Sequence, residues 1–272
     1  MLHFVPTPIG NLEDISLRSL KLLESAQIVF CEDTRVAKKL ISLLKERHSI
    51  VPIEKEYISM HSHNENYLLT QLSPEIFDKD VIYLSDAGMP VVSDPGCALI
   101  SYAQKNNIKH EVLPGANALL VAYASSGFCQ TQFLFYGFLP HKGKDRKDAL
   151  QKAMYSGFVT ILYESPHRIL KLIDQICEIE PNREIFLIKE ISKYYSSSFK
   201  AKAFEIKEQF KKENIKGEWV VVLDRVEQKL GVVSVDDILK LDISKKQASK
   251  LIAKITKKSP KECYKELLSS QE

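Results

Sequence analysis

Short apolar runs alternate with longer amphipathic segments through the first 113 residues. The runs show no polar alternation, which is typical of strands buried under helices on both faces of a parallel sheet. Between them, leucines recur at helical spacing, as at Leu17, Leu20 and Leu23 behind the candidate N-cap Ser16. This half is therefore predicted to be a parallel α/β domain with strands at Leu2–Val5, Ile28–Cys31, Val81–Leu84 and Glu111–Leu113 and helices at Ile15–Ala26, Val36–Arg47 and Cys97–Asn106.

The next hundred residues predict a second, mixed α/β domain. A helix at residues 116–126 leads into it, and the segment 199–204 alternates apolar and polar residues, which indicates an antiparallel strand with one wet face. The remaining predicted strands are Phe133–Pro140, Thr160–Tyr163, Glu184–Lys189 and Trp219–Leu223, and the helices are Lys144–Tyr155 and Arg168–Glu178.

Beyond Arg225 the pattern changes to three short helices, at Val235–Leu241, Lys246–Ile255 and Pro260–Leu268, with Ser244 and Ser259 as caps. We therefore predict an N-terminal α/β domain (1–117), a C-terminal α/β domain (118–230) and a basic helical appendix (231–272). The formal net charge is only +3, yet residues 245–261 carry seven lysines and no acidic residue. Such a run is either a solvated helix face or a surface that meets phosphates.

Composition limits the class of protein. The hydrophobic fraction of 44% is that of a globular chain, and no apolar run approaches the roughly 20 residues of a membrane span. There is no signal-peptide pattern at the start, and the five cysteines are scattered singly without a Cys-x-x-Cys pair. We expect a soluble cytoplasmic protein with buried free thiols and no membrane partner.

Two turns rich in proline and glycine carry most of the functional signal. Residues 6–11 (Pro-Thr-Pro-Ile-Gly-Asn) follow the first apolar run, and residues 85–90 (Ser-Asp-Ala-Gly-Met-Pro) follow the third. In an open α/β sheet, ligands bind at the loops that leave the carboxyl ends of strands. The two loops are therefore predicted to form one wall of a cleft, although either alone could be an ordinary βα turn.

The chain lacks the sequence motifs of several common ligand-binding sites. The chain lacks the Gly-x-x-x-x-Gly-Lys-Ser/Thr phosphate loop and has no Gly-x-Gly-x-x-Gly after its first strand, which argues against P-loop enzymes and standard dinucleotide-binding folds. His61 and His63 form a His-x-His pair without a third ligand nearby, so we expect a polar loop and no metal site.

Seven ordered segments together resemble the ribosomal RNA small subunit methyltransferase I family of the tetrapyrrole methylase superfamily. Besides the two turns, they are Glu-Asp-Thr-Arg at 32–35, His-Ser-His-Asn-Glu at 61–65, Asp-Pro-Gly at 94–96, Tyr-Gly-Phe-Leu-Pro at 136–140 and Tyr-Glu-Ser-Pro-His-Arg at 163–168. The resemblance spans nearly the whole chain. It implies methyl transfer from S-adenosylmethionine (SAM) to the 2′-oxygen of cytidine 1402 in 16S ribosomal RNA. It further implies a SAM cleft between two α/β domains, a homodimer, and 16S rRNA or the small ribosomal subunit as partner.

Methyl transfer needs alignment of the acceptor oxygen and removal of its proton. Polar residues beside strand ends are the candidates for this chemistry. The alternative for Glu32 with Arg35 is an i, i+3 surface pair near a helix start, and for Glu164 with Arg168 it is helix capping plus an i, i+4 pair. The predicted catalytic residues are Glu32, Arg35, His63, Glu65, Glu164 and Lys193; the SAM-binding residues are Pro8, Asp86, Gly88, Met89, Ala116 and Tyr163; the RNA-binding residues are Arg35, Lys142, Lys144, Arg146, Lys147 and Arg168.

Two other functions remain open from the sequence. A small-molecule methylase of the same superfamily, acting on a tetrapyrrole-like substrate, would need a large apolar cleft. A non-enzymatic RNA-binding or ribosome assembly protein is favoured only by Ala-Asn-Ala at 116–118, where the family more often has Pro-Ser or Pro-Cys after Pro-Gly. The segment 194–197 also lacks the acidic residue that usually follows the lysine at position 193.

Overall fold

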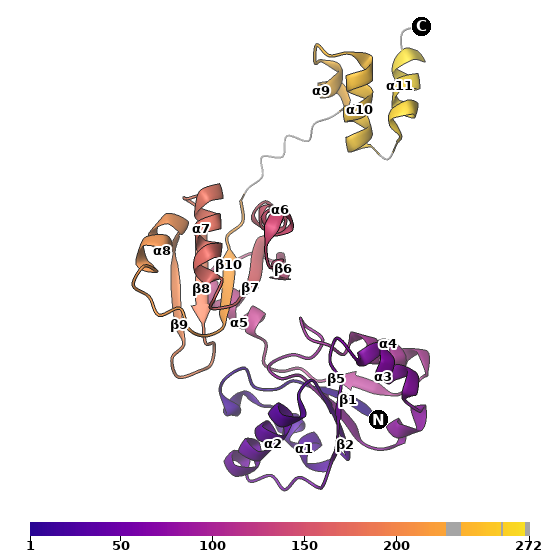
Figure 1. The fold of residues 1–272 in the computed structure, drawn as a ribbon, viewed down its shortest axis with the longest axis vertical. Coiled ribbons are helices and arrows are strands. Elements are labelled where there is room, and N and C mark those ends of the chain that lie inside the picture. The colour runs from indigo at the N-terminus through magenta and orange to yellow at the C-terminus, as the bar shows by residue number, and fades with distance from the viewer. Residues whose placement is uncertain (227–234, 257, 270–272) are drawn as a thin grey trace. The chain divides into compact units, whose positions relative to one another are not determined.

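The computed structural model describes residues 1–226, 235–256 and 258–269. The chain divides into two compact units, residues 1–226 and 227–272. Figure 1 shows the first unit from indigo to orange and the helices of the second in yellow. The predicted start of the appendix, at 230/231, lies outside the described residues. The predicted division at residue 117 falls inside the first unit, just before a helix, and remains a prediction.

The first unit begins with a parallel five-stranded sheet in the order β3-β2-β4-β1-β5. The expected α/β character is confirmed, with boundaries close to those predicted. Its strands are β1 (Leu2–Val5), β2 (Ile28–Cys31), β3 (Glu56–Ser59), β4 (Val81–Leu84) and β5 (His110–Val112), and its helices are α1 (Leu17–Ser25), α2 (Thr34–His48), α3 (Glu65–Gln71) and α4 (Cys97–Lys105), with short 3-10 turns at Leu12–Asp14 and Pro74–Asp78.

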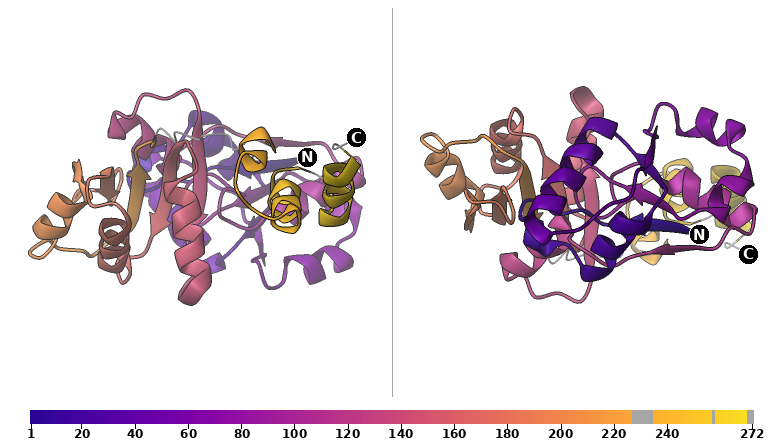
Figure 2. Two further views of the ribbon diagram at one scale, coloured as in Figure 1. Left: turned by 90° about the horizontal axis from the view of Figure 1, so that it is seen from above. Right: turned by 90° about the horizontal axis from the view of Figure 1, so that it is seen from below.

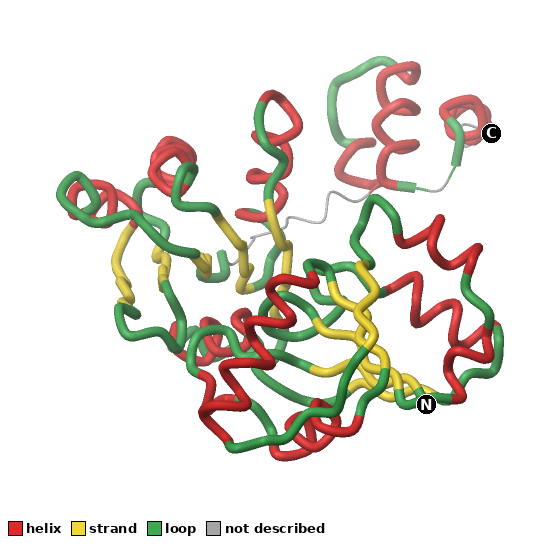
Figure 3. The backbone as a smooth tube through the Cα atoms, turned by 60° about the horizontal axis from the view of Figure 1, so that its bottom comes forward, coloured by secondary structure: helices red, strands yellow, loops and turns green. Residues whose placement is uncertain are grey.

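Helices cover both faces of this sheet (Figure 3). Side chains alternate along each strand, so Val5 and Leu84 pack under α1 and α2, whereas Phe4 and Tyr83 pack under α3 and α4. Helices cover both faces, so every residue of β1, β2 and β4 is buried, which explains the apolar runs of β2 and β4; in β1 the buried His3 is hydrogen-bonded to Glu111.

The second sheet, in the pink-to-orange part of the chain (Figures 1 and 2), has the order β6-β7-β10-β8-β9. Only β6 and β7 are parallel neighbours; the other pairs are antiparallel, as a mixed domain requires. The predicted wet-faced strand at 199–204 is confirmed as far as Lys202, with inward Phe199 and exposed neighbours on β9, whereas residues 203 and 204 belong to the helix that follows. The elements are β6 (Phe133–Phe138), β7 (Val159–Glu164), β8 (Glu184–Lys189), β9 (Ser197–Lys202), β10 (Trp219–Leu223), α5 (Ala118–Ser126), α6 (Gly143–Met154), α7 (Ile169–Ile179) and α8 (Ala203–Gln209).

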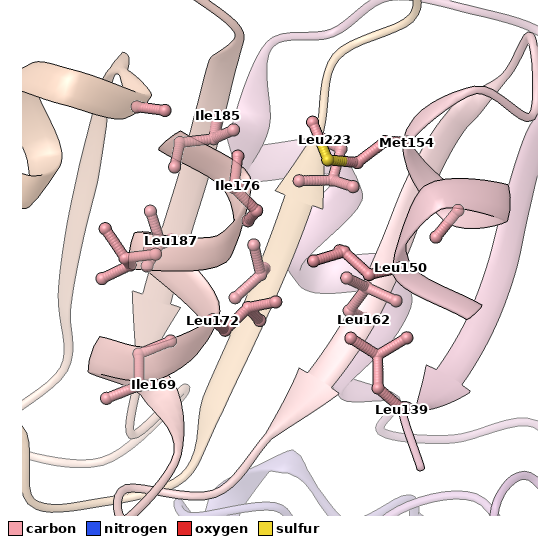
Figure 4. Close-up of a cluster of buried hydrophobic side chains, with 14 of the residues drawn as sticks. Leu139, Leu150, Met154, Leu162, Ile169, Leu172, Ile176, Ile185, Leu187 and Leu223 are labelled. Atoms are coloured by element: carbon pink, nitrogen blue, oxygen red, sulfur yellow. The ribbon is translucent and has the colours of Figure 1, made fainter. Parts of the chain in front are cut away.

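Figure 4 shows the main core of this part, where Leu172 and Ile176 of α7 and Leu150 of α6 face Leu187 and Leu162 of the sheet. Helix α5 covers the opposite face. There the apolar cluster also includes Ile9 and Val92, which come from the loops after β1 and β4. The two sheets are thus joined by packing as well as by the chain.

The second unit contains α9 (Val235–Leu239), α10 (Lys245–Ile255) and α11 (Pro260–Ser269). Its small core consists of Ile238, Ala248, Ile252 and Cys263. The predicted cap Ser244 accepts a hydrogen bond from the backbone N–H of Gln247, and Ser259 accepts one from that of Glu262. Within the described parts of both units, no helix has the length and apolarity that a membrane crossing requires.

The expectation that all cysteines are buried is wrong in part. All five are free thiols, but Cys97 and Cys129 are exposed, because they stand at the first residue of α4 and in the turn after α5.

Candidate active site

The loops after β1 and β4 meet at the carboxyl edge of the first sheet. The register places Val5 beside Leu84, and just beyond the strands the backbones of Thr7 and Gly88 hydrogen-bond to each other. The Thr7 hydroxyl also donates to the Ser85 carbonyl at 3.2 Å. The two sequence-predicted turns therefore form one continuous wall.

The same edge gathers acidic side chains. Cys31 is the register partner of Leu84, so Glu32 leaves β2 beside the start of the Ser85–Asp86 segment. Asp94 comes from the same long loop as Asp86, before α4 begins at Cys97. Glu32, Asp86 and Asp94 all line one pocket.

This pocket has a volume of about 500 Å³ and lies within the first unit. The first sheet contributes its loops, and the second contributes Tyr163 at the end of β7 and Trp219 at the start of β10. Its size falls in the range of small-molecule and cofactor sites, roughly 300–1,000 Å³. The remaining lining residues are Ile9, Ala87, Gly88, Met89, Val92, Ser93, Asn117, Ala118, Phe138, Glu164, Ser165, Pro166, Ile191, Glu218 and Val220.

Burial makes these carboxyl groups reluctant to ionise. Desolvation is the main cause that raises the pKa of Glu32, Asp86 and Asp94, and repulsion from a neighbouring acid adds to it in each case. For Asp94 the pKa rises to about 7, with Glu32 and Asp86 as the charged neighbours. An acidic pocket of this kind favours a cationic ligand group.

The loop that carries Asp94 has an unusual backbone. Val91 and Ser93 have φ values of 74° and 70°, a region that side-chain-bearing residues rarely adopt, least of all a β-branched one. Gly96 closes the loop with φ 113°, and its N–H donates to Glu65 at 3.2 Å. Such strained segments cluster at functional sites.

A turn from the second sheet closes against the loop after β1. A Cβ on Gly10 would lie 2.8 Å from the Ile191 carbonyl oxygen and 2.5 Å from Cγ of Lys193, so only glycine fits this contact. The Lys193 ammonium donates to Glu190 at 3.0 Å and to Glu218 at 3.1 Å. Glu218 lines the pocket, so Lys193 neutralises part of its wall.

Another wall rests on a buried ion cluster. The Glu164 side chain has no exposed surface; one oxygen accepts from Arg146 at 2.8 Å and the other pairs with Arg168 at 2.8 Å. Arg146 also donates to Gln175 and to the Pro140 carbonyl. The prediction that Arg146 binds RNA is wrong for this structure, because its side chain is 1% exposed and its guanidinium is bound within the protein. Glu164, predicted to be catalytic, is held as a structural anion.

The pocket brings together four of the six predicted SAM-binding residues: Asp86, Gly88, Met89 and Tyr163. Ala116 is not among the lining residues, but its carbonyl oxygen lies 3.7 Å from the position of a Cβ on Gly88. Pro8 adjoins the lining residue Ile9. Their roles as SAM ligands remain predictions.

The predicted catalytic residues are not all in one place. Glu32 and Glu164 line the pocket, and Lys193 lies behind Glu218. By contrast, Arg35 is exposed on α2 and paired with Asp33, and His63 is exposed beside His61, with ring centroids 6.0 Å apart.

The motif at 61–65 forms a turn. Asn64 accepts from the His61 N–H at 2.8 Å and donates to the Ser59 carbonyl at 3.0 Å, which shapes the entry to α3. Glu65 supports the Gly96 turn through the bond described above. This part of the motif therefore builds the loop beside the pocket, and in the described part of the chain no group of three or more His, Cys, Asp or Glu side chains could hold a metal ion.

Of the remaining predicted RNA-binding residues, three lysines are exposed on and before α6: Lys142, Lys144 and Lys147. Arg168 is partly buried, with 19% of its side chain exposed. Sequence reasoning missed five polar lining residues as site residues: Ser93, Asp94, Asn117, Ser165 and Glu218. Asp94, Asn117 and Ser165 stand in segments that the sequence analysis singles out, at 94–96, 116–118 and 163–168, whereas Ser93 and Glu218 do not.

Comparison with known proteins identifies the family of this chain. The family model of Tetrapyrrole (Corrin/Porphyrin) Methylases matches residues 1–207. A ribosomal RNA small subunit methyltransferase I from Campylobacter fetus is 48% identical over 271 residues, which are 99% of this chain and 100% of that protein. The chain belongs to the tetrapyrrole methylase family.

Two other proteins are similar to this chain. A ribosomal RNA small subunit methyltransferase I from Thermotoga maritima is 38% identical over 223 residues, 82% of this chain and 97% of that relative. The solved uroporphyrin-III C-methyl transferase from Thermus thermophilus, complexed with S-adenyl homocysteine, has a TM-score of 0.54 at 16% identity and covers 81% of this chain and 96% of its own. The latter likeness establishes the common fold.

Proposed function

We propose that this protein transfers a methyl group from SAM to the 2′-oxygen of cytidine 1402 in 16S ribosomal RNA. The observation that carries the proposal is the pocket at the carboxyl edge of the first sheet, in a chain that aligns end to end with a small-subunit rRNA methyltransferase. The homologues' names support the reaction class; the exact nucleotide and atom rest on the resemblance of the motifs.

The pocket suits SAM in size and in charge. SAM carries a sulfonium and an ammonium group, and Glu32, Asp86 and Asp94 supply negative charge for them. Gly88 brings peptide groups to the lining without a side chain, while Tyr163 offers an aromatic surface. Bound there, SAM would supply an electrophilic methyl group, with S-adenosylhomocysteine as the leaving group.

The chain's own residues then have two tasks. They must hold the ribose oxygen in line with the methyl group, and they must accept its proton. We assign the role of proton acceptor to Glu32. Unlike Glu164, it has no arginine partner among the residues that the structure describes, and its raised pKa makes it a better base than an ordinary glutamate. Lys142, Lys144 and Lys147 would hold RNA phosphates near the end of β6.

We further propose that the protein works as a homodimer in the cytoplasm, where ribosomal subunits are assembled. The dimer rests on the family resemblance alone, and light scattering at micromolar concentration tests it directly. A monomer would remove the dimer without affecting the proposed reaction.

The test of the function is transfer of labelled methyl from SAM to small ribosomal subunits and to naked 16S rRNA that lack the modification. Digestion to nucleosides should yield 2′-O-methylcytidine, and Glu32→Gln should lower the rate at least tenfold while Glu46→Gln, on the exposed face of α2, leaves it unchanged. A label on a base, or methylation of a tetrapyrrole but not of RNA, would overturn the proposal.

A further inference from the structure

The second unit is separable from the methylase fold. It has its own core, and the Thermotoga maritima relative of the same name aligns over 97% of its length with only 223 residues of this chain, close to the 226 of the first unit. The Campylobacter fetus relative aligns over 271 residues. The family model ends at residue 207, so the second unit lies outside the part of the chain that the family shares.

Helix α10 presents a row of lysines opposite to its core face. Ala248 and Ile252 point into the small core, whereas Lys246, Lys250 and Lys254 are exposed. Their spacing of four residues places them one above another, and the helical rise of about 1.5 Å per residue puts successive lysines about 6 Å apart. These lysines lie on a helix whose first turn is stabilised by the capping box of Ser244 and Gln247.

The positive charges of this row repel one another and lower the stability of α10. Like charges at i, i+4 destabilise a helix by a few tenths of a kcal/mol per pair. No carboxylate offsets them: among the described residues Lys246, Lys250 and Lys254 have no ion pair, whereas Lys258 is bound to Glu266 at 2.6 Å. A row of cations left unpaired on a rigid helix fits an external row of anions.

We propose that Lys246, Lys250 and Lys254 bind successive phosphates of an RNA strand, so that the second unit anchors the RNA substrate of the proposed methyl transfer. RNA is favoured over a membrane, because the apolar face of α10 is already buried against α9 and α11 and is not free to enter lipid. The inference rests on the proposed function for the identity of the RNA, but the phosphate contact is tested separately.

The experiment measures binding of a labelled 20-nucleotide single-stranded RNA, and of a 16S decoding-region hairpin, over a series of KCl concentrations. The full-length variant Lys246→Gln/Lys250→Gln/Lys254→Gln should bind at least tenfold more weakly at low salt. Its log–log salt slope for the single strand should be smaller by about 2, from roughly 0.7 per lost contact.

The matched control is Lys207→Gln/Lys211→Gln/Lys258→Gln, which removes the same charge from lysines bound to Asp174, Glu208 and Glu266. It should keep the wild-type slope. Thermal melting checks that the first variant is folded; losing the like-charge repulsion, it should melt no lower than wild type.

An unchanged slope in the α10 variant would overturn the proposal, as would an equal loss in the control. Lost binding to anionic vesicles (phosphatidylglycerol/phosphatidylcholine) with unchanged RNA binding would also overturn it, in favour of a membrane surface. If wild type methylates RNA but the slope is unchanged, only this inference fails; if the slope falls but no methyl is transferred, only the proposed function fails.

Discussion

The backbones of Thr7 and Gly88 exchange two hydrogen bonds, at 2.9 Å from Thr7 N to Gly88 O and at 3.1 Å from Gly88 N to Thr7 O. The Ser85 hydroxyl donates to the same Gly88 carbonyl at 2.9 Å. One glycine thus fixes the loop after β4 against the loop after β1, and the pocket wall has its shape from this contact.

Replacing Gly88 by alanine should therefore damage both stability and the pocket. Gly88 has φ 86°, and an added Cβ would lie 3.1 Å from Cγ2 of Ile9, so the substitution combines backbone strain of about 1 kcal/mol or more with crowding. Gly157→Ala is the matched control, since Gly157 has φ 81° but no neighbour within 4 Å. Urea unfolding should show a larger loss for Gly88→Ala; equal losses would mean that the Ile9 contact is unimportant.

Asp86→Ala should weaken SAM binding at least tenfold, about 1.4 kcal/mol, because it removes a carboxylate from the pocket lining. Isothermal titration calorimetry measures the affinity. Asp78→Ala, an exposed residue of the 3-10 turn before β4, is the control and should bind SAM as wild type does. Equal affinity of the two variants would remove Asp86 from the SAM site.

Glu164→Ala should be one of the most destabilising single changes in the chain. It leaves Arg146, whose side chain is 1% exposed, without its carboxylate, and breaking a buried pair from one side costs about 3–5 kcal/mol. Lys211→Ala breaks the exposed pair with Glu208 and should cost less than about 1 kcal/mol. Comparable urea midpoints for the two variants would contradict a structural role for Glu164.

The sequence predicted most of the buried framework. A strand that is buried on both faces is visible in the sequence as an apolar run. Strands β4 and β8 begin and end at the predicted residues. The edge strand β3 was missed because Glu56 and Ser59 at its ends are exposed and leave no apolar run. Helix α3 was missed with it, since its seven residues bury no side chain completely.

The site was harder to predict than the fold. Turn chemistry indicated where the loops after β1 and β4 would meet, because strand ends and glycines are local features. Pairings across the chain are not local: nothing around Arg146 distinguishes it from the exposed Lys144 and Lys147, and only the fold brings it to Glu164, 18 residues away. Glu218 likewise lines the pocket and accepts a hydrogen bond from Lys193, 25 residues away.

Stability and SAM binding should both depend on the charge of Asp94. Its pKa is raised to about 7 mainly by desolvation, whereas an unfolded aspartate titrates near 4, so the folded state holds the extra proton in this window. The contribution of Asp94 to stability is therefore fully present below about pH 4 and is lost as pH rises through about 7. Glu32 and Asp86, whose pKa values are also raised, act in the same direction.

Asp94→Asn removes the charge but keeps the size, so the variant should unfold at a higher urea concentration than wild type at pH 8, and this advantage should shrink at pH 5. SAM affinity should change in the opposite sense, because the cationic cofactor favours the ionised carboxylate. The wild type should therefore bind SAM more tightly at pH 8 than at pH 6. In Asp94→Asn this increase in affinity with pH should be smaller. The exposed Asp78→Asn should track wild type in both measurements. A urea midpoint difference between Asp94→Asn and wild type that is the same at pH 5 and pH 8 would show that Asp94 does not titrate in this range.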